Sequence, residues 1–188
     1  MKQTSIHTCR DPGAHWIKQY GVPAVCFSVW APKAEKVEVH LLAADDRLVS
    51  LAKDDFGYHS GVIENVPAGA DYLFRLDGTV ERPDPASRWQ PQGVHSPSRV
   101  MDWQFDWTDG AWSGLPLRDY IVYELHVGTF SPEGTFDGVI KRLSELKELG
   151  VTAIEIMPVA QFPGSRNWGY DGVYPFAVQE SYGGPAGL

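Results

Sequence analysis

The chain has few cysteines, no long apolar run and no excess of basic residues. Cys9 and Cys26 are its only cysteines, too few for a disulfide framework and without the C-x-x-C spacing of a zinc or redox site. We therefore expect two free thiols and a reducing, cytoplasmic location. The first residues lack the apolar core of a signal peptide, and no later window resembles a membrane span, so we expect no membrane partner.

Several classes of function are disfavoured by what is missing. With 16 Lys and Arg against 24 Asp and Glu, the net charge is -8, and the basic patch of a nucleic-acid binder is absent. The six histidines show neither H-x-H nor H-E-x-x-H spacing. No Walker loop, dinucleotide fingerprint or G-x-S-x-G motif is present. We expect no nucleic acid, no metal and no cofactor, and a neutral or cationic partner.

Alternating apolar residues are the first positive feature of the 188-residue chain. They begin at Ala24, recur near residues 37–41, 58–63 and 72–76, and are separated by turn sequences such as Asp77-Gly78. Short strands at this spacing predict an antiparallel sandwich over residues 24–82. Residues 1–23 show no clear period and stay unassigned.

Residues 83–118 are rich in proline and glycine and show no period of their own. This segment carries five large aromatic side chains, whose burial is worth a few kcal/mol each at about 25 cal/mol per Å². We expect it to be a linker packed as a seam between two domains, although a sugar-binding role stays open for one of these rings: Trp89, Trp103, Phe105, Trp107 and Trp112.

A different pattern fills residues 119–188. Residues 121–127 and 151–157 are nearly continuous apolar runs, typical of parallel strands buried on both faces. Between them, apolar residues at helical spacing predict one helix over 136–149, with Thr135 as N-cap and Gly150 as C-cap. We expect a βαβ unit with a right-handed crossover. A further helix should begin near Pro185.

This βαβ unit is compatible with the start of a (β/α)₈ barrel. Such a barrel needs about 250 residues, so we expect it to be truncated. The loop after a barrel strand lies on the face where substrates bind, and the second strand is followed by the sequence Asn-Trp-Gly-Tyr-Asp-Gly at 167–172.

Motifs along most of the chain point to one family. They lie at residues 83–88, 92–95, 123–130, 132–136, 146–159 and 166–174. The chain resembles the α-amylase superfamily of glycoside hydrolases, and within it the malto-oligosyltrehalose trehalohydrolases. The strand motifs alone also fit glycogen-branching or debranching enzymes; Glu-Gly-Thr-Phe at 133–136 and the sequence at 167–174 favour the trehalohydrolases.

The resemblance implies an immunoglobulin-like sandwich followed by an amylase-type barrel. It also implies a retaining hydrolase that cleaves the α-1,4 bond next to the terminal trehalose of maltooligosyl trehalose, through two carboxylates about 5 Å apart. Those carboxylates belong to later strands in the family, so we expect no catalytic residue here and an inactive 188-residue chain. A non-catalytic α-glucan-binding module is the alternative outside enzymes. The oligomeric state is left open.

Three residues are candidates for substrate binding through the same resemblance. Tyr170 matches the tyrosine that stacks on the sugar, and Trp168 and Asp171 are its neighbours. Their alternatives are a core aromatic for Tyr170, a loop wedge for Trp168 and a structural Asp-Gly turn for Asp171.

Three other polar residues have an ordinary structural interpretation. Glu124 and Glu155 lie in neighbouring strands and could form a carboxylate pair, but both are mid-strand. We expect them to be satisfied positions in the barrel wall. His126, near a strand end, could touch substrate, but a buried, hydrogen-bonded histidine is the expected outcome.

Overall fold

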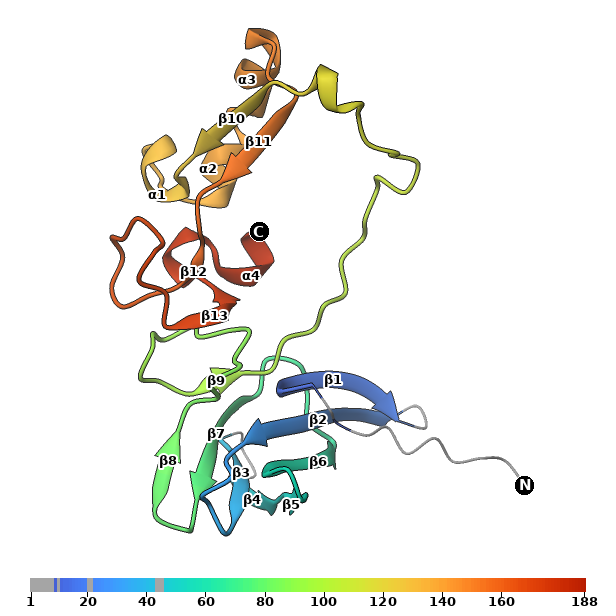
Figure 1. Cartoon of the computed structure of the whole chain (residues 1–188), viewed down its shortest axis with the longest axis vertical. Helices are drawn as coiled ribbons and strands as arrows, with labels where there is room; N and C mark the ends of the chain where they lie inside the picture. The colour runs from blue at the N-terminus through green and yellow to red at the C-terminus, as the bar shows by residue number, and fades with distance from the viewer. Residues whose placement is uncertain (1–8, 10, 20–21, 43–45) are drawn as a thin grey trace, which may run out of the picture. The chain divides into compact units, whose positions relative to one another are not determined.

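The computed structural model divides the chain into two compact units, residues 1–102 and 103–188. Residues 9, 11–19, 22–42 and 46–188 are described (Figure 1). The predicted starts of the sandwich, the linker and the barrel portion, at residues 24, 83 and 119, stay predictions.

Two antiparallel sheets build the first unit, as the alternating pattern predicts. One sheet has the order β1 (Gly13–Gln19), β2 (Val22–Trp30), β6 (Tyr58–Glu64), β5 (Ala52–Lys53). The other has the order β4 (Arg47–Ser50), β3 (Val37–Leu41), β7 (Asp71–Leu76), β8 (Val80–Arg82), and β9 (Ser98–Arg99) also pairs with β7. The strand β1 lies in the part of the sequence that showed no period.

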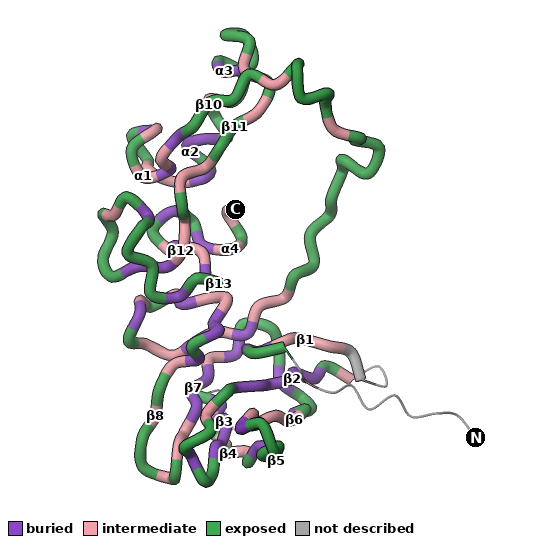
Figure 2. The backbone as a smooth tube through the Cα atoms, viewed as in Figure 1, coloured by how far each residue is buried: buried purple, intermediate pink, exposed green. Residues whose placement is uncertain are grey.

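The core of this unit lies between the two sheets. Val25 and Phe27 of β2 share one buried cluster with Val39 of β3 and Phe74 of β7, and β2 is mostly buried in Figure 2. The ring of Tyr72 packs edge-on against Phe27 and Phe74, at centroid distances of 5.0 and 5.9 Å. The predicted sandwich is therefore confirmed.

The cysteines differ from the prediction of free thiols, which is wrong. A disulfide joins Cys9 to Cys26 of β2, with 5.7 Å between their Cα atoms. Cys26 is buried. The pairing requires Cys9 to lie beside β2, and a separation of 17 residues along the sequence does not indicate that the two cysteines are close in space. The reason given for a reducing compartment is lost, and the location stays a prediction.

The predicted linker behaves as two different segments. Its first part packs onto the sandwich, because β9 pairs with β7, Val100 joins the core, and the Arg99 guanidinium stacks over Trp89 at 5.1 Å. Its second part belongs to the second compact unit, and the seam expected there stays a prediction. Residues 103–116 form no strand or helix in the described chain, and the tube of Figure 2 is mostly green, that is exposed, along this segment. Exposed fractions of 58–75% are found for Trp103, Phe105, Trp107 and Trp112.

The second unit contains the predicted parallel strand pair. After the short 3₁₀ helix η1 (Leu117–Asp119), β10 (Val122–Leu125) pairs in parallel with β11 (Ala153–Ile156), so that Val122 faces Ala153 and Leu125 faces Ile156. The helices between them are α1 (Val127–Phe130), α2 (Phe136–Ile140) and α3 (Leu143–Leu149). The parallel pairing is therefore confirmed.

The single helix expected over 136–149 is wrong, because it is broken between α2 and α3. Both predicted caps are confirmed: the Thr135 hydroxyl accepts from the Gly138 N–H, and Gly150 adopts the left-handed conformation. The break lies at Arg142, whose backbone leaves the helical range and whose side chain donates to the Phe130 carbonyl at 3.0 Å. The same guanidinium stacks over the Phe130 ring at 4.9 Å.

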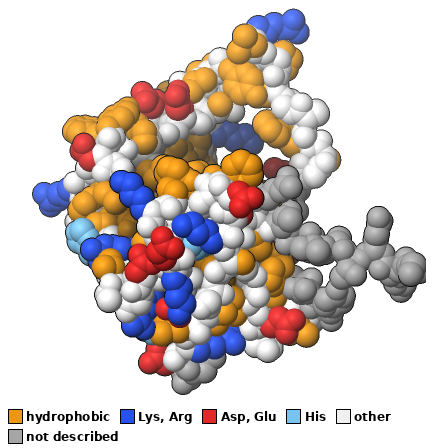
Figure 3. Space-filling model, turned by 60° about the horizontal axis from the view of Figure 1, so that its bottom comes forward, with side chains coloured by type: hydrophobic (Ala, Val, Ile, Leu, Met, Phe, Trp, Pro, Cys, Tyr) orange, Lys and Arg blue, Asp and Glu red, His pale blue; other side chains and the backbone are white. Residues whose placement is uncertain are grey.

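The two strands are less buried than expected. Leu125 is buried, but Ile121, Val122, Tyr123 and Ile154 have exposed fractions of 37–58%. A two-stranded sheet has too few neighbours to cover both of its faces, so side chains of apolar strands stay exposed. Apolar side chains also reach the surface on the face drawn in Figure 3, where they lie among charged ones.

The chain ends with a second strand pair and a short helix. β12 (Ala160–Gln161) pairs antiparallel with β13 (Tyr174–Val178), and the 3₁₀ helix η2 (Glu180–Tyr182) leads into α4 (Gly184–Gly187). Pro185 lies in the first turn of α4, as predicted. Among the described residues, every helix is too short or too polar to cross a bilayer.

Candidate functional site

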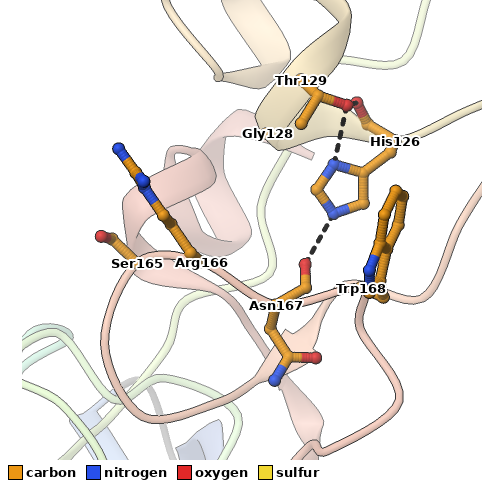
Figure 4. Close-up of a pocket in the computed structure, with 7 residues that line it drawn as sticks. All are labelled: His126, Gly128, Thr129, Ser165, Arg166, Asn167 and Trp168. Atoms are coloured by element: carbon orange, nitrogen blue, oxygen red, sulfur yellow. Dashed lines mark hydrogen bonds between the residues drawn. The ribbon is translucent and has the colours of Figure 1, made fainter.

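A cavity of about 500 Å³ opens in the second unit beside the end of β10. One side comes from the start of α1 and the other from the loop between β12 and β13, which we call the 162–173 loop. Figure 4 shows the residues that line this cavity: His126, Gly128, Thr129, Ser165, Arg166, Asn167 and Trp168.

His126 lines the cavity and is half-buried between α1 and the 162–173 loop. Its Nδ1 atom is 3.1 Å from the Thr129 hydroxyl, and its Nε2 atom is 2.7 Å from the backbone carbonyl of Asn167 (Figure 4). The Trp168 ring packs edge-on against the imidazole at 5.4 Å. His126 is also the N-cap residue of α1, so one residue links the strand end, the helix and the loop.

Tyr182 supports this histidine from the core. Its side chain is 2% exposed and packs edge-on against the rings of His126, Phe136 and Phe162. Burial raises the pKa of the Tyr182 hydroxyl, which therefore keeps its proton. This hydroxyl lies 3.1 Å from Nε2 of His126 and donates to the Asn167 carbonyl at 3.4 Å.

Asn167 organises the tip of the loop through its side chain. Its Oδ1 accepts from the Gly169 N–H at 2.7 Å, and its Nδ2 donates to the Asp171 carboxylate at 3.1 Å. Gly169 has a φ of 95°, and a Cβ there would lie 2.0 Å from the Pro158 carbonyl oxygen. Only glycine fits this position, so the tip is held in one defined turn.

The three predicted substrate-binding residues all lie on this loop, but they occupy different places. Trp168 lines the cavity, with 66% of its surface exposed, whereas Tyr170, 70% exposed, and Asp171 are not among the lining residues. Tyr170 is thus not the core aromatic considered as its alternative. Their role in binding sugar stays a prediction.

His126 is the organising residue that sequence reasoning treated as ordinary. It is hydrogen-bonded as expected, but it is only half-buried and faces the cavity. Its position directly after a strand was the available sign. Its partner Asn167 is 41 residues away, and the contact could not be found from local spacing.

Glu124 and Glu155 differ from the expected satisfied positions in a barrel wall. They face each other in the register of β10 and β11, and both are exposed. Water can reach both carboxylates, so neither depends on a buried partner. Within the described ranges, no group of three or more His, Cys, Asp or Glu side chains is arranged to hold a metal ion.

Comparison with known proteins gives a consistent result. Residues 12–89 match the family described as carbohydrate-binding module 48, the isoamylase N-terminal domain. The chain is 52% identical to a malto-oligosyltrehalose trehalohydrolase from Saccharolobus solfataricus over 164 residues, which are 87% of this chain and 29% of the relative. The resemblance to the N-terminal part of these trehalohydrolases is confirmed.

Two further matches show how far the similarity extends. A Salmonella typhimurium protein whose crystal structure carries an alpha amylase name aligns with a TM-score of 0.86 and 40% identity, over 96% of this chain and 30% of that one. A 1,4-alpha-glucan branching enzyme from Nitrosomonas europaea is 28% identical over 92% of this chain and 26% of its own length. The chain spans less than a third of the length of the curated relatives it matches.

Proposed function

We propose that this chain supplies the N-terminal part of a retaining glycoside hydrolase that acts on maltooligosyl trehalose. The reaction is cleavage of the α-1,4 bond next to the terminal trehalose, with release of trehalose. The observation that carries this proposal is the contrast in identity: 52% to a trehalohydrolase against 28% to a branching enzyme. A branching or debranching activity is therefore the weaker enzymatic alternative.

The proposed architecture is an immunoglobulin-like sandwich at 24–82, a linker at 83–118 and the opening of an amylase-type (β/α)₈ barrel at 119–188. The parallel pairing of β10 with β11 supports the barrel. So does the exposure of Ile121, Val122 and Ile154, because further strands and helices of a barrel would cover such side chains.

The proposed substrate contact is the 162–173 loop, with Tyr170 as the stacking platform and Trp168 and Asp171 beside it. The exposure of both rings supports this role, since the apolar C–H face of a pyranose can be desolvated by an aromatic ring. Exposed Asp171 can accept hydrogen bonds from sugar hydroxyls. We place no catalytic carboxylate in this chain and expect the isolated chain to be inactive. We expect the whole enzyme to be cytoplasmic.

The test is a chimera in which this chain replaces the matching N-terminal residues of the Saccharolobus solfataricus relative. We expect the chimera to release trehalose from maltooligosyl trehalose, whereas the 188-residue chain alone does not. Tyr170→Ala in the chimera should lower kcat/KM about twofold to tenfold, because an aromatic contact is worth roughly 0.5–1.5 kcal/mol. Tyr170→Phe, which keeps the ring, is the matched control.

Other outcomes would support the alternatives. A folded chimera that forms branched glucan and no trehalose would favour the branching enzymes. Saturable binding of maltoheptaose by the 188-residue chain, followed by tryptophan fluorescence, would favour a non-catalytic α-glucan-binding module.

A further inference from the structure

The side chain of His126, the residue before α1, contacts the backbone carbonyl of Asn167 in the middle of the 162–173 loop. Both ends of this loop have their own anchors. The Val173 N–H donates to the Gln161 carbonyl at 2.8 Å, and the buried Gln179 side chain donates to the Gly164 carbonyl at 2.9 Å. The contact with Asn167 lies between them, immediately before Trp168.

The partners of His126 define which ring nitrogen carries hydrogen. The Asn167 carbonyl oxygen can only accept, so Nε2 must donate across the 2.7 Å contact. In the neutral ring, Nδ1 is then an acceptor, and the Thr129 hydroxyl at 3.1 Å can donate to it. The Tyr182 hydroxyl, which donates to the same carbonyl, closes the network.

The surroundings leave the imidazole little freedom to turn. A Cβ on Gly128 would lie 2.8 Å from Cε1 of Tyr182 and 3.1 Å from Cε1 of His126. The two rings therefore pack closely over a position without a side chain. A ring held in this way presents its N–H to Asn167 in a fixed direction.

We propose that His126 is a positioning residue for substrate binding. By donating from Nε2 to the Asn167 carbonyl, it fixes the tip of the 162–173 loop and with it Trp168 and Tyr170. The sugar-binding consequence rests on the proposed function, whereas the anchoring of the loop does not. His126 itself need not touch the reacting atoms.

The anchoring is tested first on the 188-residue chain with trypsin, because Arg166 is exposed and precedes Asn167. Glutamine can place an amide N–H near the position of Nε2, whereas the shorter asparagine reaches only the position of Nδ1. His126→Asn should speed cleavage after Arg166 about tenfold, the effect of losing one hydrogen bond. His126→Gln should recover most of the native protection.

Cleavage after Arg118, whose side chain is 84% exposed, is the control for a general loss of stability of the second unit. The ratio of the two cleavage rates should rise only in His126→Asn. If that variant does not fold, Thr129→Val decides, because it keeps the imidazole and removes the hydroxyl that lies 3.1 Å from its Nδ1 atom. It should raise cleavage after Arg166 about twofold to threefold.

The consequence for substrate is tested in the chimera with the trehalohydrolase relative. We expect His126→Asn to raise KM for maltooligosyl trehalose about tenfold with kcat within about twofold, and His126→Gln to restore KM. A purely structural role would lower the folded fraction, and thus the apparent kcat, at an unchanged KM.

Two results would overturn the inference. One is an unchanged ratio of cleavage after Arg166 to cleavage after Arg118 in His126→Asn. The other is a raised ratio in this variant together with a native KM when the same substitution is made in an active chimera. The proposed function fails separately, if the unsubstituted chimera releases no trehalose, and the trypsin ratio still decides whether His126 anchors the loop.

Discussion

At the scale of single residues, Asp84 is a buried carboxyl group surrounded by donors. The Tyr72 hydroxyl donates to it at 2.6 Å and the Ala86 N–H at 2.8 Å. Burial nevertheless dominates and raises the pKa of Asp84 from 3.8 to about 6. The folded chain therefore takes up this proton more readily than the unfolded chain. The resulting stability is fully present below about pH 4 and is lost as the pH rises through 6.

Replacing Asp84 with Asn should remove this titration. Between pH 4 and 7, the free energy of unfolding should fall by roughly 3 kcal/mol less in Asp84→Asn than in the native chain, since each pKa unit corresponds to about 1.4 kcal/mol. Urea unfolding at a series of pH values measures the difference. Tyr72→Phe removes a donor that lowers the pKa and should move the loss of stability to higher pH. Equal pH profiles for Asp84→Asn and the native chain would contradict the prediction.

At the scale of elements, the end of α3 depends on the backbone of Gly150. Its φ is 101°, and a Cβ added there meets no atom within 4 Å. A substitution therefore tests backbone strain alone. Gly150→Ala should destabilise the second unit by about 1–2 kcal/mol, seen as faster hydrogen exchange of the α3 amides. Gly110→Ala, also without close neighbours and outside the left-handed region, is the control, and an equal effect of both changes would refute the argument.

Elements determined by local chemistry could be predicted from the sequence, and those determined by distant contacts could not. The strands of the sandwich and the caps Thr135 and Gly150 follow from alternation and side-chain chemistry within a few residues. The break at Arg142 could not be predicted, because it goes with contacts to Phe130 across a turn. The same holds for the site. The 162–173 loop could be found from its sequence motif, whereas the hydrogen bond from His126 to Asn167 joins segments 41 residues apart and could not be predicted.

At the scale of the whole molecule, the two units have separate cores, which differ in how completely they bury their apolar side chains. The first core combines residues from both sheets, and Val25, Phe27, Val37 and Val39 are fully buried. The second is built around Phe162 and Tyr182, while Ile121 and Val122 at its strand pair are exposed. Because buried apolar area supplies most of the folding free energy, the units should differ in stability.

We therefore expect the second unit to open well before the first. Amide hydrogens of β2, β3 and β7 should exchange on the order of 100-fold more slowly than those of β10 and β11, because local opening follows the amount of buried apolar contact. Hydrogen exchange followed by mass spectrometry measures both units in one sample. Comparison in low urea is the control: added denaturant should speed exchange of β10 and β11 first and leave the sandwich strands protected. Equal protection of both strand groups would mean that the second unit is stabilised by more than its own core, and the exposed face of β10 and β11 would then have to be covered in solution.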